Sequence, residues 1–210
     1  MKKTLLIIVL LSFGFSQRQE KNEIITERHD NGLKKLVLVF EGTGINETLI
    51  GRYGFYDTGV KHFVELYKNN KKHGKSIYWY KNGQKKEEVT YKNVKLDGLW
   101  TSWYKNGQKR IEGIYKDGKK DGIWTEWYEN GQKRIESIYK DGKLDGLWTS
   151  WYENGQKKEE VTYKNVKLDG IWTGWHENGQ KEREGTYKDG KKDGIWTGWH
   201  ENGQKEREGT

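Results

Sequence analysis

The sequence contains no cysteine, no proline and no alanine. Without cysteine the chain forms no disulfide bond, no thiolate nucleophile and no sulfur-ligated zinc or iron site. Without alanine it lacks the residue with the highest helix propensity, which disfavours helical architectures. Aliphatic residues are also scarce, since Ile, Leu, Val and Phe together account for 42 of 210 residues, a level close to that of disordered chains.

Aromatic residues supply the apolar surface that the aliphatic residues do not. The chain has 11 Trp and 13 Tyr, most of them at a fixed spacing, and these large rings can build a core. Its 27 glycines occur without proline, which is typical of turns inside a β-structure rather than of a flexible linker. The composition therefore favours an ordered β-protein.

The N-terminus has the pattern of an export signal. Lys2 and Lys3 precede an uncharged run at 4–16, and a polar segment begins at Gln17. The run is shorter than the roughly 20 apolar residues that a membrane-spanning helix needs. We predict a signal peptide at 1–16, cleavage near Ser16-Gln17 and an exported protein that is periplasmic, at the cell surface or secreted. An apolar core strand or helix is the alternative for this segment.

A repeat of 24 residues dominates the rest of the chain. Asn-Gly-Gln begins at 82, 106, 130, 154, 178 and 202, and Asp-Gly followed by an apolar residue and Trp recurs with the same step. Residues 171–186 reappear unchanged as 195–210, which indicates recent duplication. We predict a polar N-terminal segment with a degenerate hairpin at 17–50 and tandem hairpin repeats at 51–210, regular from about residue 74.

Each repeat predicts two strands and two turns. In the unit at 97–120, the predicted strands are Leu99 to Lys105 and Gln108 to Lys116, joined by a type I′ turn at Asn106-Gly107. Asp117-Gly118 and Asp121-Gly122 form a predicted wider return to the next unit. The expected fold is all-β, an elongated antiparallel meander of tandem 24-residue β-hairpin repeats, with no helix after the signal peptide.

A two-residue turn at Asn106-Gly107 sets the cross-strand register. Trp100 then lies opposite Gly113, on the face that carries Tyr104 and Tyr115, and Trp103 lies on the other face. The first face predicts a continuous aromatic strip that forms the core. Its buried members are expected to be Trp100, Trp124, Trp148, Trp172 and Trp196. The second face is the candidate binding surface, a more exposed ladder of Trp103, Trp127, Trp151, Trp175 and Trp199.

Charged side chains are expected to cover this ladder. The predicted register places Arg110, Arg134 and Lys158 over Trp103, Trp127 and Trp151, in cation–π contacts worth about 0.5–1 kcal/mol each. In the last two repeats Glu182 and Glu206 take these positions, so the predicted ladder is not uniform.

No pattern predicts catalysis, a metal site or a cofactor. His176 and His200 stand where other units have tyrosine, and residues two strands apart lie about 10 Å from one another, too far to share a zinc ion. Lysines interrupt the acidic residues of 116–122, unlike a calcium loop. Gly42-Thr43-Gly44 lacks the further glycine and the helix of a phosphate loop. We therefore predict that the protein is not an enzyme.

The positive charge lies in the first part of the chain. Residues 1–96 hold 18 Lys and Arg against 10 Asp and Glu, which accounts for the net charge of +8, and residues 97–210 hold 21 of each. The regular repeats have no net charge with which to follow phosphates, so no nucleic-acid partner is expected. The basic N-terminal part is suited to anionic lipid, a cell-wall polymer or an acidic partner.

The repeat resembles the bacterial variant of the MORN repeat. The motif is Asp-Gly-x-Trp-x-x-Trp-Tyr-x-Asn-Gly-Gln-Lys, followed by a charged strand that ends in Tyr-Lys-Asp-Gly-Lys. The resemblance covers about residues 51–210, with a weaker echo from residue 23. Tandem arrays of this kind are commonly labelled YwqK-type antitoxins of toxin–antitoxin systems, and the resemblance implies that role as one of the functions to be weighed.

Three functions are therefore predicted as alternatives. The first is an exported, non-enzymatic scaffold that binds another protein through repeated weak contacts. The second is binding of a surface glycan or the cell envelope, because tryptophan faces stack on sugar rings. The third is an intracellular antitoxin that neutralises its partner by direct contact, and localisation separates it from the first two. We also expect edge-to-edge self-association at the C-terminus, where the last hairpin leaves a strand edge unpaired.

Overall fold

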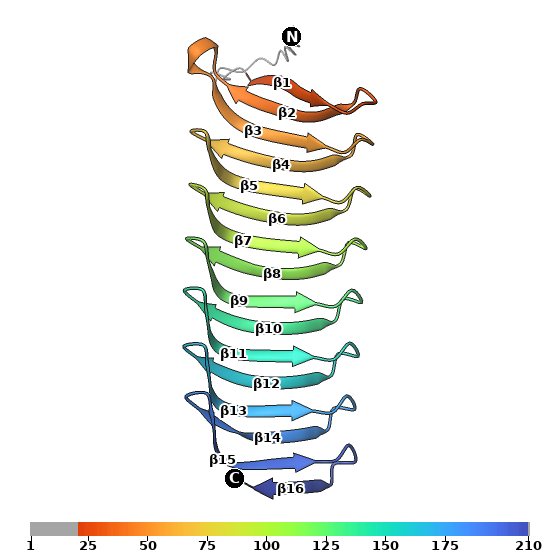
Figure 1. Ribbon diagram of the computed structural model, residues 1–210, viewed down its shortest axis with the longest axis vertical. Coiled ribbons are helices and arrows are strands. Elements are labelled where there is room, and N and C mark those ends of the chain that lie inside the picture. The colour runs from red at the N-terminus through yellow and green to blue at the C-terminus, as the bar shows by residue number, and fades with distance from the viewer. Residues whose placement is uncertain (1–20, 210) are drawn as a thin grey trace, which may run out of the picture. The chain divides into compact units, whose positions relative to one another are not determined.

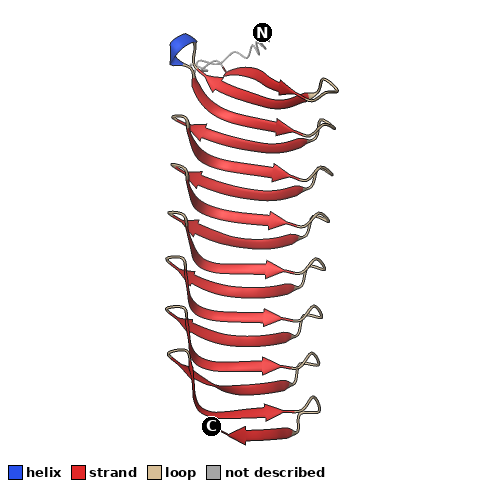
Figure 2. Ribbon diagram, in the orientation of Figure 1, coloured by secondary structure: helices blue, strands red, loops and turns tan. Residues whose placement is uncertain are grey.

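The computed structural model describes residues 21–209, which are almost entirely β-strand. The predicted signal peptide and the cleavage site before Gln17 lie outside this range. Among the described residues the one helical element is the 3-10 turn η1 (Gly44–Asn46), and strands and loops make up the rest (Figure 2). No helix between residues 21 and 209 has the length and apolar character to cross a membrane. The all-β prediction is confirmed.

The chain divides into two compact units, residues 1–96 and residues 97–210. Within each unit every strand pairs antiparallel with the next strand in the chain, which confirms the predicted meander of hairpins (Figure 1). The strands of the first unit are β1 (Lys21–Arg28), β2 (Lys34–Glu41), β3 (Thr48–Phe55), β4 (Lys61–Lys68), β5 (Lys71–Trp79) and β6 (Lys85–Lys92). The second unit begins within β7 (Lys95–Trp103) and continues with β8 (Lys109–Lys116), β9 (Lys119–Trp127), β10 (Lys133–Lys140), β11 (Lys143–Trp151), β12 (Lys157–Lys164), β13 (Lys167–Trp175), β14 (Lys181–Lys188), β15 (Lys191–Trp199) and β16 (Lys205–Gly209).

The Asn-Gly turns are three-residue loops, and the prediction of a type I′ turn there was wrong. Between β7 and β8, the Gly107 N–H donates to the Tyr104 carbonyl at 3.0 Å, and the Tyr104 N–H donates to the Gln108 carbonyl at 2.9 Å. Gly107 has a φ of 90°, whereas Asn106 keeps a negative φ. This is a type I turn followed by a glycine bulge. The strands accordingly end at Trp103 and restart at Lys109, short of the predicted limits.

The glycine bulge shifts the register at that end of the hairpin. Trp100 lies opposite Gly113, as predicted, but Trp103 lies opposite Lys109 instead of Arg110. A shift of one residue moves a side chain to the other face of the sheet. The charged residues that were predicted to cover the ladder tryptophans, Arg110, Arg134 and Lys158, therefore lie on the opposite face of the sheet.

The type I′ turns lie at the opposite end of the hairpins. Asp117 and Gly118 have φ values of 50° and 85°, and the flanking Lys116 and Lys119 pair directly. This two-residue loop replaces the predicted wider return. Asp121 and Gly122 belong to β9, where the strand bends and Gly122 has a φ of 74°.

A valine occupies the second position of two such turns. Val94 and Val166 have φ values of 72° and 70°, a conformation that costs an ordinary residue about 1–2 kcal/mol. Val166→Gly is expected to stabilise the second unit by about 1 kcal/mol, because the relieved strain exceeds the added chain entropy. Urea unfolding measures the change. The reverse substitution in a neighbouring turn, Gly142→Val, should destabilise by a similar amount, and no effect in either variant would contradict this assignment.

The aromatic strip runs along one face of the second unit. Trp100 and Trp124 stack with ring centroids 5.5 Å apart, and Tyr115 meets Trp124 edge-on at 5.0 Å. Trp196 makes the same kind of edge contact with Tyr187 at 5.1 Å. Trp124 is 3% exposed, and the other nine tryptophans of the second unit are half-buried. The expected contrast in exposure between strip and ladder thus appears only at Trp124.

The residue that lies beneath the strip, Gly113 in β8 and Ser137 in β10, determines which of two conformations the bend in the following strand adopts. Where it is glycine, the next tryptophan lies directly over the backbone, so that a Cβ at Gly113 would sit 2.2 Å from the Trp124 ring. Gly113, which pairs with Trp100 in β7, then has no direct partner in β9, and the pairing with β9 resumes between Ile114 and Asp121. Where the position is Ser137, the residue pairs directly with Trp148. The presence or absence of one Cβ atom therefore decides the local register.

A lysine accompanies the glycine form of the bend. The Lys120 Nζ lies 4.1 Å from the Trp124 ring centroid, and the Lys192 Nζ lies 4.5 Å from that of Trp196. The units with Ser137 or Val161 have leucine at the corresponding position. The ammonium group covers the tryptophan ring that lies over the glycine backbone, and this cation–π contact stabilises the glycine form of the bend.

Candidate binding face

The face of the second unit opposite the aromatic strip carries a regular set of side chains, and we name it the ladder face. In the hairpin of β11 and β12, Leu147, Thr149 and Trp151 alternate onto this face. Glu160 lies opposite Thr149, and Lys157 lies opposite Trp151. Thr162, opposite Leu147, lies on this face as well. Residues at 24-residue steps from these positions continue the face, which includes all five tryptophans predicted for the candidate binding surface.

An ion pair lies in the middle of each repeat of the ladder face. Lys157 Nζ is 2.6 Å from the Glu160 carboxylate, and Thr149 Oγ1 donates to the same carboxylate at 3.4 Å. Thr149 is buried, whereas both charged side chains keep contact with solvent, so each pair contributes at most about 1 kcal/mol. The equivalent pairs are Lys109 with Glu112, Lys133 with Glu136, Lys181 with Glu184 and Lys205 with Glu208.

The same lysines cover the tryptophans of the following repeat. Lys157 Nζ lies 5.5 Å from the ring centroid of Trp175, and Lys181 Nζ lies 5.8 Å from that of Trp199. Lys109 and Lys133 make the corresponding contacts with Trp127 and Trp151 at 5.6 and 5.4 Å. Each of these four tryptophans is therefore held by a cation from the preceding repeat.

The cation–π partners named in the sequence analysis are corrected accordingly. Lys158 lies over Tyr152 and Arg134 pairs with Glu126, so neither covers a ladder tryptophan. Trp103 faces Lys109 and not Arg110. Glu182 and Glu206 do not interrupt the ladder, because Trp175 lies opposite Lys181 and Trp199 opposite Lys205. The glycine bulge accounts for all of these differences, and the ladder is uniform.

An exposed apolar row accompanies the ion pairs. Leu147 is 44% exposed and Ile171 is 64% exposed. The equivalent Leu99, Ile123 and Ile195 are exposed by 52%, 58% and 58%. Aligned apolar side chains with this much exposure are typical of contact surfaces. This row was not predicted, although the apolar residue between Asp-Gly and Trp in every regular repeat is its signal in the sequence.

The tyrosines next to the Asn-Gly loops connect successive repeats. Tyr128 Oη donates to the Trp151 carbonyl at 2.8 Å, and the His176 Nε2 makes the same contact with the Trp199 carbonyl at 2.9 Å. Burial, together with nearby carboxylates, raises the pKa of Tyr152 in the same row. His176 thus takes the place of a tyrosine, as predicted, and makes the same structural hydrogen bond.

The asparagines of these loops have the same role. Asn130 Nδ2 donates to the Glu153 carbonyl at 2.9 Å, and Asn130 Oδ1 accepts the Gln132 N–H at 2.9 Å. One side chain therefore closes its own loop and bonds to the next one. Between residues 21 and 209, no group of three or more His, Asp or Glu side chains is placed to hold a metal ion.

One known protein family matches the hairpin repeat. The profile described as the MORN repeat variant matches residues 72–93, 96–117, 120–141, 144–165, 168–189 and 192–210. Each of the first five matches covers one Asn-Gly hairpin and reaches the following type I′ turn. A comparison with curated proteins gives no match.

Proposed function

The chain belongs to the MORN repeat variant family, and we propose that it is a non-enzymatic scaffold that binds another protein through its ladder face. The observation that carries this proposal is the exposed apolar row beside the ion pairs, repeated in every unit of residues 97–210. The proposal includes export of the protein, on the strength of its N-terminal sequence. The antitoxin role that the resemblance implies is a separate alternative, because it would use the same kind of protein binding inside the cell, without export.

Repetition allows contacts that are individually weak to add up to a useful affinity for a partner. Equivalent residues recur every two strands, which is about 10 Å along the sheet. Each repeat offers one apolar side chain, such as Leu147, and one ion pair, such as Lys157 with Glu160. A partner that engages several repeats gains affinity because each further contact is intramolecular. The exposed charges add specificity and on-rate more than affinity.

Binding of a glycan is a second candidate, favoured by the tryptophan at every repeat of the ladder face. Sugar rings stack on indole faces, and the spacing of the ladder suits an extended polymer. Lysine ammonium groups lie 5.4 to 5.8 Å from the ring centroids of Trp127, Trp151, Trp175 and Trp199. A sugar must displace this lysine to stack on the same ring face, which lowers the gain from stacking.

Site-specific crosslinking tests the protein-binding proposal. A photoreactive residue at Ile171, on the ladder face, is expected to give covalent adducts of defined protein mass in the producing cells. The same residue at Glu153, in an exposed loop, serves as the control. Adding Leu147→Lys should reduce the Ile171 adduct at least tenfold without changing the thermal midpoint, because Leu147 is exposed.

The outcomes separate the candidate functions. An adduct at Ile171 that is insensitive to Leu147→Lys, or equal adducts at both positions, would contradict binding through the ladder face. Retention on insoluble cell-wall polysaccharide that is lost in Trp151→Ala, without any protein adduct, would identify the glycan function instead.

A further inference from the structure

A hollow in the first unit is lined only by neutral or basic side chains. Lys68, Asn69, Lys71, His73 and Asn93 surround a volume of about 560 Å³. They come from the end of β4, the start of β5 and the two neighbouring turns. Ammonium, carboxamide and imidazole groups all donate hydrogen bonds, and no carboxylate is among the lining residues.

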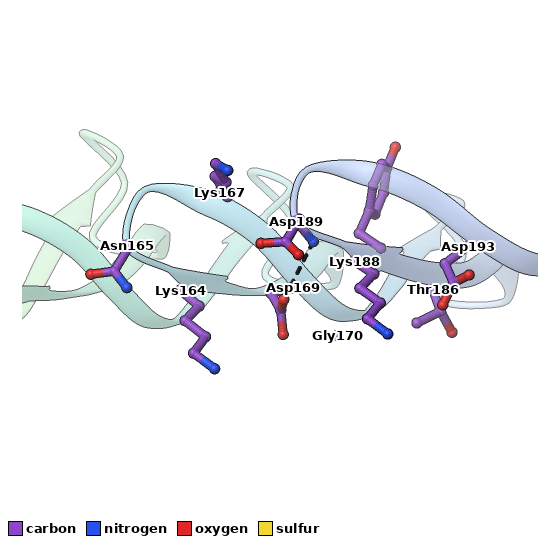
Figure 3. Close-up of a pocket in the computed structure, with 10 residues that line it drawn as sticks. Lys164, Asn165, Lys167, Asp169, Gly170, Thr186, Lys188, Asp189 and Asp193 are labelled. Atoms are coloured by element: carbon purple, nitrogen blue, oxygen red, sulfur yellow. Dashed lines mark hydrogen bonds between the residues drawn. The ribbon is translucent and has the colours of Figure 1, made fainter.

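The second unit contains the matching hollow with the opposite chemistry. Lys164, Asn165 and Lys167 take the same positions as Lys68, Asn69 and Lys71, exactly four repeats later in the chain. Asp169 and Asp189 stand where the first unit has His73 and Asn93 (Figure 3). This hollow of about 540 Å³ is also lined by Asp193. Its lysines therefore share the space with three carboxylates.

His73 accepts the same backbone hydrogen bond as the aspartate of the second unit, but it carries no negative charge. In the second unit the Asp189 N–H donates to Asp169 Oδ2 at 3.4 Å (Figure 3). In the first unit the Asn93 N–H donates to His73 Nδ1 at 3.5 Å. Because Nδ1 accepts this bond, the ring proton is on Nε2, which remains a donor. The turn is held in both units, but only the first hollow stays free of negative charge.

The lysines of the first hollow lack a counter-charge. Lys68 and Lys71 lie directly opposite one another in the register of β4 and β5, and like charges in this position are destabilising. Both are exposed, and within the described part of the chain neither forms an ion pair. At the position of His73 every regular repeat has aspartate, namely Asp97, Asp121, Asp145, Asp169 and Asp193. The replacement of this aspartate beside the lysine pair is thus particular to this site.

We propose that the hollow between β4, β5 and the turn at Asn93 binds a phosphate group. A tetrahedral oxyanion has enough acceptor oxygens for Lys68, Lys71, the two asparagine amides and His73 Nε2. It also removes the repulsion between the two ammonium groups. The aspartates of the second unit would repel the same ligand, so the second hollow does not bind it.

A reciprocal swap between the two units tests this inference. Inorganic phosphate is titrated into the full-length chain by calorimetry at constant ionic strength, and one site is expected. The variant His73→Asp/Asn93→Asp should lose at least tenfold in affinity. The variant Asp169→His/Asp189→Asn/Asp193→Asn, which removes all three carboxylates, should raise the stoichiometry from one to two. The side chains introduced at 73, 93, 169 and 189 already occur at the equivalent place in the other unit, so both variants should keep the parent's thermal midpoint.

Two further titrations identify the source of the phosphate. Tighter binding of glycerol 3-phosphate than of inorganic phosphate shows that the site accepts the phosphoester of a larger molecule, and equal binding shows a site for the free ion. Sodium acetate serves as the planar, singly charged comparison and should bind at least tenfold more weakly. Absence of saturable phosphate binding by the parent chain, or unchanged affinity and stoichiometry in both swap variants, would overturn the proposal.

Discussion

Replacing Glu65 by alanine is expected to destabilise the first unit by about 3–5 kcal/mol. Glu65 is 6% exposed and accepts hydrogen bonds from Lys72 at 2.6 Å, Tyr78 at 2.8 Å and Tyr67 at 3.2 Å, with Arg52 at 3.4 Å. Removing the carboxylate leaves the charge of Lys72 partly buried and two tyrosine hydroxyls without their acceptor. The loss is large because an isolated buried charge costs more than the intact ion pair contributes.

The pH dependence of this loss follows from the Glu65 carboxyl group. Burial alone would raise its pKa, but the hydrogen bonds from Lys72 and Tyr78 and the charges of Lys72 and Arg52 outweigh burial and lower the pKa. A lowered folded-state pKa contributes stability above the unfolded value of about 4.3, and that contribution is lost as the pH falls through the folded pKa. Urea unfolding at pH 7 and pH 3 should therefore show a smaller pH effect in Glu65→Gln than in the parent.

Glu27→Ala is the matched control for Glu65→Ala. Glu27 pairs with Lys35 at 3.0 Å, and both side chains are about half exposed. Screening by solvent limits such a pair to less than about 1 kcal/mol. Hydrogen exchange of β4 and β5 reports the stability of the first unit in both variants. A Glu65→Ala variant that is no less stable than Glu27→Ala would show that the buried network does not hold this unit.

Gly113→Val is expected to destabilise the second unit by about 3 kcal/mol, at the upper end of the range for overpacking. The added Cβ would lie 2.2 Å from the Trp124 ring, which is 3% exposed and stacked on Trp100. Trp124 must then leave its place, and its Nε1–H loses the hydrogen bond of 3.2 Å to the Ile114 carbonyl. Urea unfolding gives the free energy, and near-ultraviolet circular dichroism reports the lost ring packing.

Ser137→Val provides the control at the same position of the next repeat. Ser137 already carries a Cβ and pairs with Trp148, and the following repeat has Val161 opposite Trp172. The change should alter the stability by less than about 0.5 kcal/mol, the range of substitutions that create no clash or cavity. A Gly113→Val variant as stable as Ser137→Val would mean that the bend converts freely between its two forms.

The sequence predicts the hairpins because the relevant information is local. The 24-residue period, the alternation around Trp100 and Trp103 and the turn residues depend on neighbours in the chain, and they lead to an antiparallel meander. The central register, with Trp100 opposite Gly113 and Trp148 opposite Val161, also follows from this pattern. The hollow of the first unit was not predicted, since it joins residues from consecutive turns.

Contacts between repeats determine the conformation of the Asn-Gly loop, which the local sequence pattern does not determine. Asn-Gly is compatible with both a type I′ turn and a type I turn with a glycine bulge. The bulged loop lets Asn106 Nδ2 donate to the Glu129 carbonyl at 3.0 Å and Tyr104 Oη donate to the Trp127 carbonyl at 2.7 Å. These bonds join residues 23 positions apart, so the sequence of one hairpin does not contain them. They stabilise the bulged loop, which turns Lys109 and Arg110 to the faces opposite to those predicted. The register from Ile111 onward is unchanged, because the bulge shifts the pairing only at that end of the hairpin.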